Sequence, residues 1–382
     1  MNLYFGLINL MHDPVIGTCF ADLRPFATKR LPMLLQKFTI GDEYLKNLVD
    51  SVVDVFQYGV EERAHGAFLS LEQLEGSLSP TKAGIQRVLA AASLIPRTLF
   101  SRIHRPWQGF LVAGYYNEFF SSHYDVINLP FKYLFHPQEW IGLFHETGHV
   151  AIFDTNFFNM DSVKITAALK RGLHAAPEEE YEVWRELVFE VGADLFDLYF
   201  CYGEDFGGYL SNIWPFLIRV SGSLCEEYFV RSFIAYEYWK HFICARRSRF
   251  PATLSLREEV GSFREKLGKL TQDVPGRSRR QADDAAIFGF SVLAPIVDLY
   301  HHRFRQQGPP KNLGRSLASP VLRAQVNTVL RGGVVTQRIS SPDAFLLALK
   351  RHQTERNEEL PLSVRLATIL SLWHSAVTDR PR

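Results

Sequence analysis

His145, Glu146 and His149 form an H-E-x-x-H pattern, and this pattern constrains the local fold more than any other segment of the sequence. Two histidines four residues apart lie one turn apart on the same face of an α-helix, so both imidazole rings can reach one point. The sequence therefore predicts a helix that begins at Pro137 and carries all three side chains. The residues around the pattern are uncharged, which is typical of a buried helix: Leu143, Phe144, Thr147, Gly148, Val150 and Ala151.

This helix offers the groups that a zinc site requires. Zn²⁺ binds neutral imidazole nitrogens and, in catalytic sites, keeps one position for water. Glu146 follows the first histidine and can act as the general base on that water. Random placement gives the five-residue pattern in roughly three chains per hundred of this composition, so a third ligand is needed to tell a site from a coincidence.

Candidates for the third ligand lie on a second predicted helix, from about residue 177 to about residue 202. Glu190 and Asp194 are four residues apart on a face that is otherwise apolar, and acids in such a position need partners. Glu190 can ligate the metal while Asp194 accepts a hydrogen bond from the second nitrogen of a ligand imidazole. Glu186, one turn earlier, is the alternative third ligand, with Glu190 then as its partner.

The two segments resemble the gluzincin group of zinc metallopeptidases, which pair H-E-x-x-H with a downstream E-x-x-x-D. The resemblance covers residues 142–194 and favours Glu190 over Glu186, because Asp194 completes the pattern. The sequence departs from the thermolysin-like members at Phe189, where those carry asparagine. A longer histidine-rich pattern is excluded, since Thr155 stands where its third histidine would be.

The resemblance implies a zinc metallopeptidase that acts on a peptide or protein substrate. Metal-bound water would attack the amide carbonyl, and Glu146 would pass the proton to the leaving amine. In such folds the strand before the site helix forms the edge of the cleft and pairs with an extended peptide, a place that residues 124–129 occupy here. Candidate donors to the oxyanion are Tyr228, Tyr236 and His241, and also Arg231, Tyr181, Tyr199 and Tyr202, each more typical of a structural role.

Composition bears on the other partners and on location. The 42 basic residues are matched by 41 acidic ones, which argues against a nucleic-acid-binding protein. The sequence has no apolar window long enough for a membrane span and no signal-peptide pattern, so we expect a cytoplasmic protein; its oligomeric state is not indicated. The cysteines form no C-x-x-C pair, which argues against a zinc ribbon or a disulfide framework; they are Cys19, Cys201, Cys225 and Cys244.

Apolar periodicity predicts an α+β fold that is mostly helical. With the resemblance, this becomes a zincin-like arrangement of a small β-sheet, the active-site helix and a helical C-terminal half. The predicted strands are 99–103, 109–116 and 124–129. Further helices are predicted at 44–58, 208–220, 222–246, 283–306 and 361–377, with breaks at 276–280 and 308–315.

Four regions follow from these elements. They are a mainly helical region 1–95, a zincin-like core 96–205, a helical subdomain 206–307 that completes the cleft, and a helical extension 308–382. Two other functions stay open. One is a binding or regulatory protein that keeps a zincin-like fold without catalysis, because a fold does not fix a function. The other is a helical protein in which the H-E-x-x-H pattern is accidental.

Overall fold

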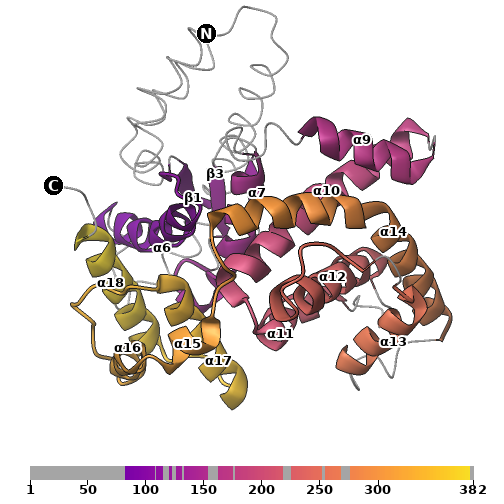
Figure 1. The fold of residues 1–382 in the computed structure, drawn as a ribbon. Helices are drawn as coiled ribbons and strands as arrows, with labels where there is room; N and C mark the ends of the chain where they lie inside the picture. Colours follow the sequence, from indigo (N-terminus) through magenta and orange to yellow (C-terminus); the bar gives the residue numbers. More distant parts are fainter. Residues whose placement is uncertain are drawn as a thin grey trace, which may run out of the picture. The chain divides into compact units, whose positions relative to one another are not determined.

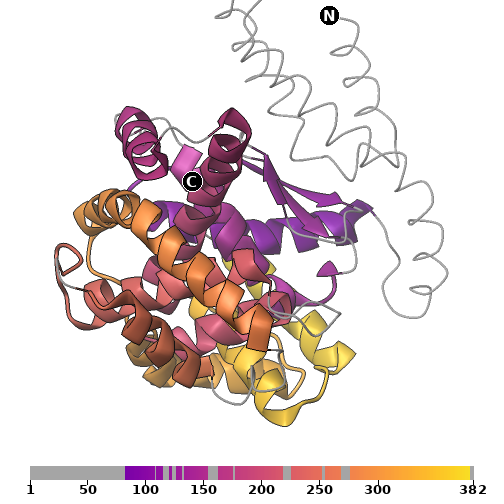
Figure 2. The ribbon, with the colours of Figure 1, turned by 90° about the vertical axis from the view of Figure 1, so that its right-hand side faces the viewer.

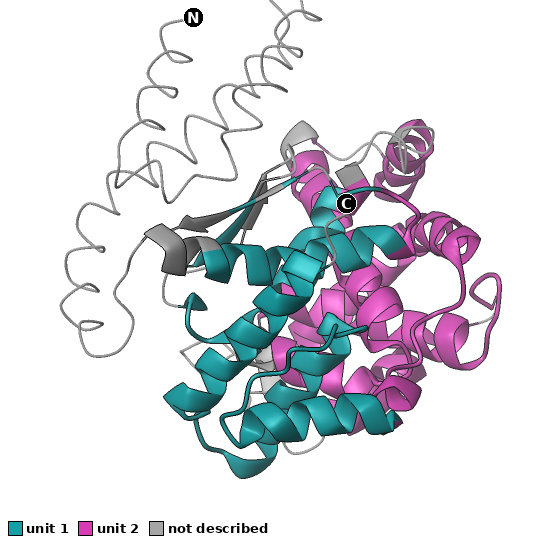
Figure 3. Ribbon diagram, turned by 90° about the vertical axis from the view of Figure 1, so that its left-hand side faces the viewer, with its two compact units in different colours: residues 1–101, 106–150, 319–382 teal, residues 102–105, 151–318 magenta. Residues whose placement is uncertain are grey.

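The computed structural model describes residues 82–107, 109–114, 120–122, 126–130, 133–153, 162–174, 177–217, 225–251, 254–267 and 276–378. This part of the chain is mostly helical, as predicted, and contains a small sheet (Figure 1). The helix predicted at 44–58 lies outside the described residues. The chain divides into two compact units (Figure 3). Unit 1 is Met1–Ser101, Pro106–Val150 and Ser319–Arg382, and unit 2 is Arg102–Arg105 and Ala151–Ala318.

Helix α6 (Lys82–Arg102) includes most of a segment for which the sequence predicted a strand. The strand predicted at 99–103 is wrong. The buried residues of α6 include a stripe at the spacing of one helix face, Val88, Ala92, Ile95 and Leu99, and every residue from Ala91 to Ile95 is buried. Burial of this stripe therefore overrides the strand preference of the aromatic and β-branched residues at 99–103.

The small sheet has the strand order β1-β3-β2. Strand β1 (Phe110–Gly114) runs parallel to β3 (Val126–Pro130), and β2 (Phe120–Ser122) runs antiparallel to it. The strands predicted at 109–116 and 124–129 are confirmed, and β2 was not predicted. Because β3 is the central strand and is paired on both sides, its backbone cannot receive an extended peptide. The cleft edge predicted for residues 124–129 is therefore wrong.

The remaining elements of unit 1 surround the start of the H-E-x-x-H helix. A short 3-10 helix, η3 (Pro137–Glu139), has Pro137 at its first position, and α7 (Gly142–Phe153) begins only after it. Lys350 on α17 (Pro342–Arg356) donates to both carboxylate oxygens of Glu139 at 2.7 and 2.8 Å, which fixes η3 on α17. Helices α16 (Pro320–Leu330) and α18 (Leu362–Thr378) complete this unit, and the second confirms the helix predicted at 361–377.

Unit 2 is helical throughout its described part. It contains α9 (Ser162–Leu173), α10 (Glu178–Asp197), η4 (Leu198–Tyr202), α11 (Phe206–Leu217), α12 (Glu226–Tyr238), η5 (Trp239–Cys244), α13 (Leu256–Leu267), α14 (Gly276–Gln307) and α15 (Leu313–Ala318). The long helix α14 packs against α12, α9, α10 and α13 (Figure 2). The helices predicted at 177–202, 208–220, 222–246 and 283–306 are confirmed. The break predicted at 276–280 is wrong, because its arginines are good helix formers and begin α14.

Segments η4 and η5 are π-helical turns that directly continue α10 and α12. The amide of Gly203 donates to the carbonyl of Leu198, and that of Ala245 donates to Lys240, each five residues back. Gly203 adopts a φ of 56°, which favours glycine and ends the helix where the sequence predicted. Within the described residues, no helix is long and apolar enough to cross a membrane, in agreement with the sequence.

Candidate metal centre

The two histidines of α7 approach each other closely. Their Nε2 atoms lie 3.1 Å apart, and the rings meet edge to face with centroids 4.7 Å apart. Two nitrogens bound to one tetrahedral zinc ion at about 2.05 Å lie about 3.3 Å from each other. The 3.1 Å separation is that of a hydrogen bond between the two rings, and it is also close to the separation of two nitrogens that share one zinc ion. His149 is 9% exposed and Glu146, between them in sequence, is 8% exposed.

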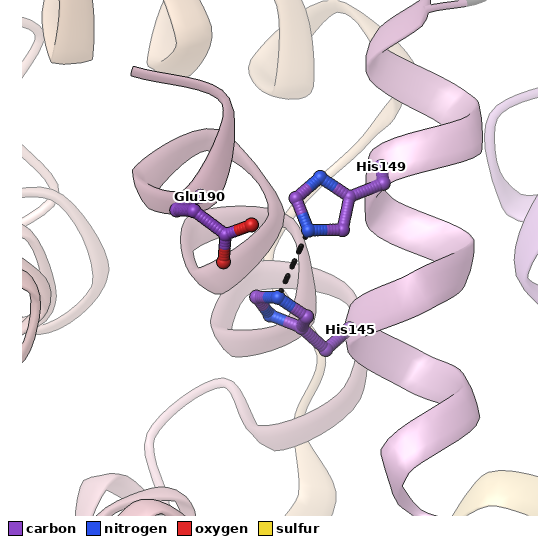
Figure 4. A group of neighbouring side chains, drawn as sticks. All are labelled: His145, His149 and Glu190. Atoms are coloured by element: carbon purple, nitrogen blue, oxygen red, sulfur yellow. Dashed lines mark hydrogen bonds between the residues drawn. The ribbon is translucent and has the colours of Figure 1, made fainter. Parts of the chain in front are cut away.

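Glu190 on α10 belongs to the same group of potential ligands. One ligand atom from each of His145, His149 and Glu190 lies within 4.8 Å of the other two (Figure 4). The histidines belong to unit 1 and Glu190 to unit 2, so its assignment as third ligand stays a proposal. Glu186, the alternative third ligand, has an exposed side chain and is not part of this group.

Within unit 2, Arg231 on α12 holds both acids that the sequence singled out on α10. Its guanidinium donates to the two carboxylate oxygens of Asp194 at 2.7 and 3.0 Å and lies 2.9 Å from Glu190 Oε2. Arg231 and Asp194 are both buried. Burial alone would lower the pKa of the Arg231 guanidinium, but the charges of Asp194 and Glu190 outweigh it and hold this pKa above its usual value.

This arrangement gives Asp194 a partner that the sequence analysis did not assign to it. Its predicted role, a hydrogen bond from a ligand imidazole, stays a prediction. The signal in the sequence was the position of Arg231 among apolar residues such as Val230 and Phe233, although Glu227 lies one turn earlier on the same face and 3.5 Å from it. A buried arginine needs acidic partners, and the two acids on the apolar face of α10, Glu190 and Asp194, were the other candidates.

Of the candidate oxyanion donors, Arg231 contacts Glu190 and Asp194 directly, and Tyr228 lies next to Arg231. The Arg231 guanidinium carbon lies 4.8 Å from the centre of the Tyr228 ring. Burial raises the pKa of the Tyr228 hydroxyl, Arg231 opposes that rise, and the carboxylate of Glu190 adds to it. Tyr228 therefore stays protonated at neutral pH and can donate a hydrogen bond.

The other candidate donors have different surroundings. Tyr236 stacks on Trp239, and His241 lies 3.2 Å from Glu237. Ten residues separate His241 from Arg231, which is about 15 Å along a helix, so His241 does not belong with Glu190. The remaining tyrosines have structural contacts: the Tyr199 hydroxyl donates to the Gly308 carbonyl, Asn212 donates to the Tyr202 hydroxyl, and Lys170 lies over the Tyr181 ring.

Comparison with known proteins adds no further constraint on this site. No protein-family model, no curated protein and no solved structure matches the chain. The chemistry of the histidine pair on α7 and of the charged residues on α10 and α12 is therefore the basis for assigning a function.

Proposed function

We propose that this protein is a zinc-dependent metallopeptidase with a zincin-like α+β core. His145, His149 and Glu190 are the proposed metal ligands, and Glu146 is the proposed general base. The observation that carries this proposal is the 3.1 Å separation of the two Nε2 atoms on α7, with Glu146 on the same helix. The substrate is a peptide or protein, and a cytoplasmic location is expected.

The donor set fits zinc. Two imidazole nitrogens and one carboxylate oxygen are a ligand combination that catalytic zinc sites use, and three protein ligands leave one position for water. Zinc bound there would polarise the substrate carbonyl and lower the pKa of its water. Glu146 would accept the proton of that water and deliver it to the leaving amine.

Arg231 supports this arrangement from the side of α10. The Arg231 guanidinium lies 2.9 Å from Oε2 of Glu190. A carboxylate can bind a metal through one oxygen, which leaves its second oxygen to pair with Arg231. The ion pair is therefore compatible with ligation, and it restricts the rotamers that the Glu190 side chain can adopt. Tyr228 is the candidate donor to the oxyanion, because its ring lies against Arg231.

Metal content and turnover test the proposal together. Glu146→Gln should keep the metal of the wild-type protein and lose hydrolysis of a broad peptide library, because only the base is removed. His149→Asn should lose one equivalent of zinc and all hydrolysis. A folded wild type without zinc at this site, or Glu146→Gln with wild-type turnover, would contradict the proposal. Zinc at this site without turnover in the wild type would instead indicate the non-catalytic binding protein.

A further inference from the structure

A second group of potential ligands lies within unit 2, away from the H-E-x-x-H helix. It consists of Glu237 at the end of α12, His241 in η5 and Glu259 on α13. One ligand atom from each of these residues lies within 4.8 Å of the other two. The oxygens and nitrogens around a tetrahedral zinc ion lie about 3.4 Å apart, so small rotamer changes would close the group around one ion.

Glu237 is the most unusual member of this group. It is 0% exposed, and neither of its carboxylate oxygens has a hydrogen-bond partner within the described part of the chain. Nε2 of His241 lies 3.2 Å from Glu237 Oε2, and this nitrogen also lacks a hydrogen bond of good geometry there. A buried carboxylate without hydrogen bonds costs several kcal/mol unless a proton or a cation neutralises it.

The nearby basic side chain of Lys240 does not neutralise the Glu237 carboxylate by itself. The Lys240 ammonium forms an ion pair with Glu259, so its charge is already matched. Nε2 of His241 lies 3.2 Å from Oε2 of Glu237, and an imidazole binds a metal through a deprotonated ring nitrogen.

We propose that Glu237, His241 and Glu259 bind one divalent transition-metal cation of the zinc type, which ties α13 to the end of α12. Three ligand atoms from two helical segments converge on one point, and a cation satisfies all three at once. Two of them flank the start of a π-helical turn, a feature that is frequent at functional sites. The low exposure of the group is typical of a structural ion, since Glu259 is the most exposed member at 17% of its side chain.

A proton is the competing neutraliser. Burial, and then repulsion by Glu259, raises the pKa of Glu237 to about 8, so without a cation this side chain would be a neutral acid. A proton on Glu237 could be shared with Glu259, and the other oxygen of Glu237 would then depend on the 3.2 Å contact with Nε2 of His241, whose geometry is poor for a hydrogen bond. Glu237→Gln separates the two cases, because glutamine has the shape of the neutral acid and cannot replace a carboxylate ligand.

The experiment measures bound zinc per chain and thermal stability, with Zn²⁺ alone as the added ion. The background is the full chain with His149→Asn, so that the site on α7 does not contribute. We expect this variant to keep one equivalent of zinc and to show a higher Tm with zinc than after chelation. Adding Glu237→Gln or His241→Asn to this background should remove both the bound equivalent of zinc and the increase in Tm with zinc.

Glu226→Gln is the matched control, because Glu226 is an exposed glutamate in the first turn of the same helix. It should leave the zinc content and the Tm increase unchanged. Zinc content that is the same with and without Glu237→Gln would overturn the proposal, and so would a His149→Asn background that binds no zinc. Both results are independent of whether the site on α7 hydrolyses peptides.

Discussion

Arg231 and Asp194 form a buried ion pair in which two guanidinium nitrogens donate to both carboxylate oxygens, at 2.7 and 3.0 Å. The pair joins α12 to α10 and explains how α10 tolerates a charged residue on its apolar face. It also places the Arg231 guanidinium beside Glu190, the proposed metal ligand. Stability and metal binding in this region therefore depend on the same arginine.

Removing Arg231 should destabilise the protein strongly. Arg231→Met leaves the carboxylate of Asp194 buried without its ion-pair partner, and loss of one member of a buried pair costs about 3–5 kcal/mol. We expect the free energy of unfolding in urea to fall by this amount. Adding Asp194→Leu to Arg231→Met should recover much of the loss, because the unpaired charge is gone. A loss below about 1 kcal/mol for Arg231→Met would show that the pair is solvated, as in exposed ion pairs.

Glu190 and Glu186 should differ sharply in their effect on zinc affinity. Loss of a residue that hydrogen-bonds a metal ligand weakens metal affinity by about 10- to 100-fold. Glu190→Gln removes a proposed ligand itself and should therefore weaken zinc binding by more than this. Glu186 is one turn away and exposed, so Glu186→Gln should leave the affinity unchanged. Competition with a chelator of known affinity measures both variants. The opposite ranking would make Glu186 the third ligand.

Gly192 should not tolerate a methyl group. A Cβ atom there would lie 2.7 Å from Ile152 Cδ1 and from Tyr300 Cζ, which is closer than real Cβ contacts. Overpacking of this kind costs about 1–3 kcal/mol, which outweighs the gain of about 1 kcal/mol in helix propensity. Gly192→Ala should therefore lower the free energy of unfolding. Gly261→Ala on α13 is the control, since nothing lies within 4 Å of its Cβ position, and it should stabilise.

His301 should make the protein less stable in acid. Burial, then the charge of Arg305, lowers the pKa of His301 to about 4, and its Nδ1 lies 3.2 Å from the Tyr238 hydroxyl. Between the unfolded value of about 6.5 and this folded value, the unfolded state binds one more proton. The free energy of unfolding therefore falls as the pH drops through this window, by up to about 1.4 kcal/mol per pH unit from this group.

A pair of variants isolates that contribution. His301→Asn keeps a polar group near the Nδ1 position and should flatten the pH dependence of urea unfolding between about pH 6.5 and pH 4. The neighbouring His302 is exposed, so His302→Asn should keep the wild-type slope. Equal slopes in the two variants would mean that another group controls the acid sensitivity.

The parts of the structure that could be predicted are those that local sequence determines. The helix of His145 and His149 follows from their spacing, and the end of the helix near residue 202 follows from Gly203, which adopts a positive φ. Strand β2, with three residues, is too short to show any periodicity. The segment at 99–103 has strand-forming residues, but its place in the buried stripe of α6 depends on the tertiary fold.

Contacts between distant residues were the least predictable. Helix α13 is strongly charged, and its buried residues, Val260, Phe263 and Leu267, were too few to single it out in the sequence. The approach of Glu259 to Glu237 follows from how α13 and α12 pack, which no local pattern encodes. The same reason applies to the pair of Arg231 with Asp194, which lies on α10 and is 37 residues away in the sequence.

The two π-helical turns bear on how sequences of this type should be compared. Each turn of η4 and η5 encloses one residue more than an α-helical turn, and each follows a helix that carries proposed ligands. A homologue with regular α-helix at either place would therefore align only with a one-residue gap. A gap between Glu237 and His241 would shorten their spacing from four residues to three, whereas a gap at 242–244 would leave the pair unchanged. The position of the gap therefore decides whether the proposed second cation site keeps its ligand spacing.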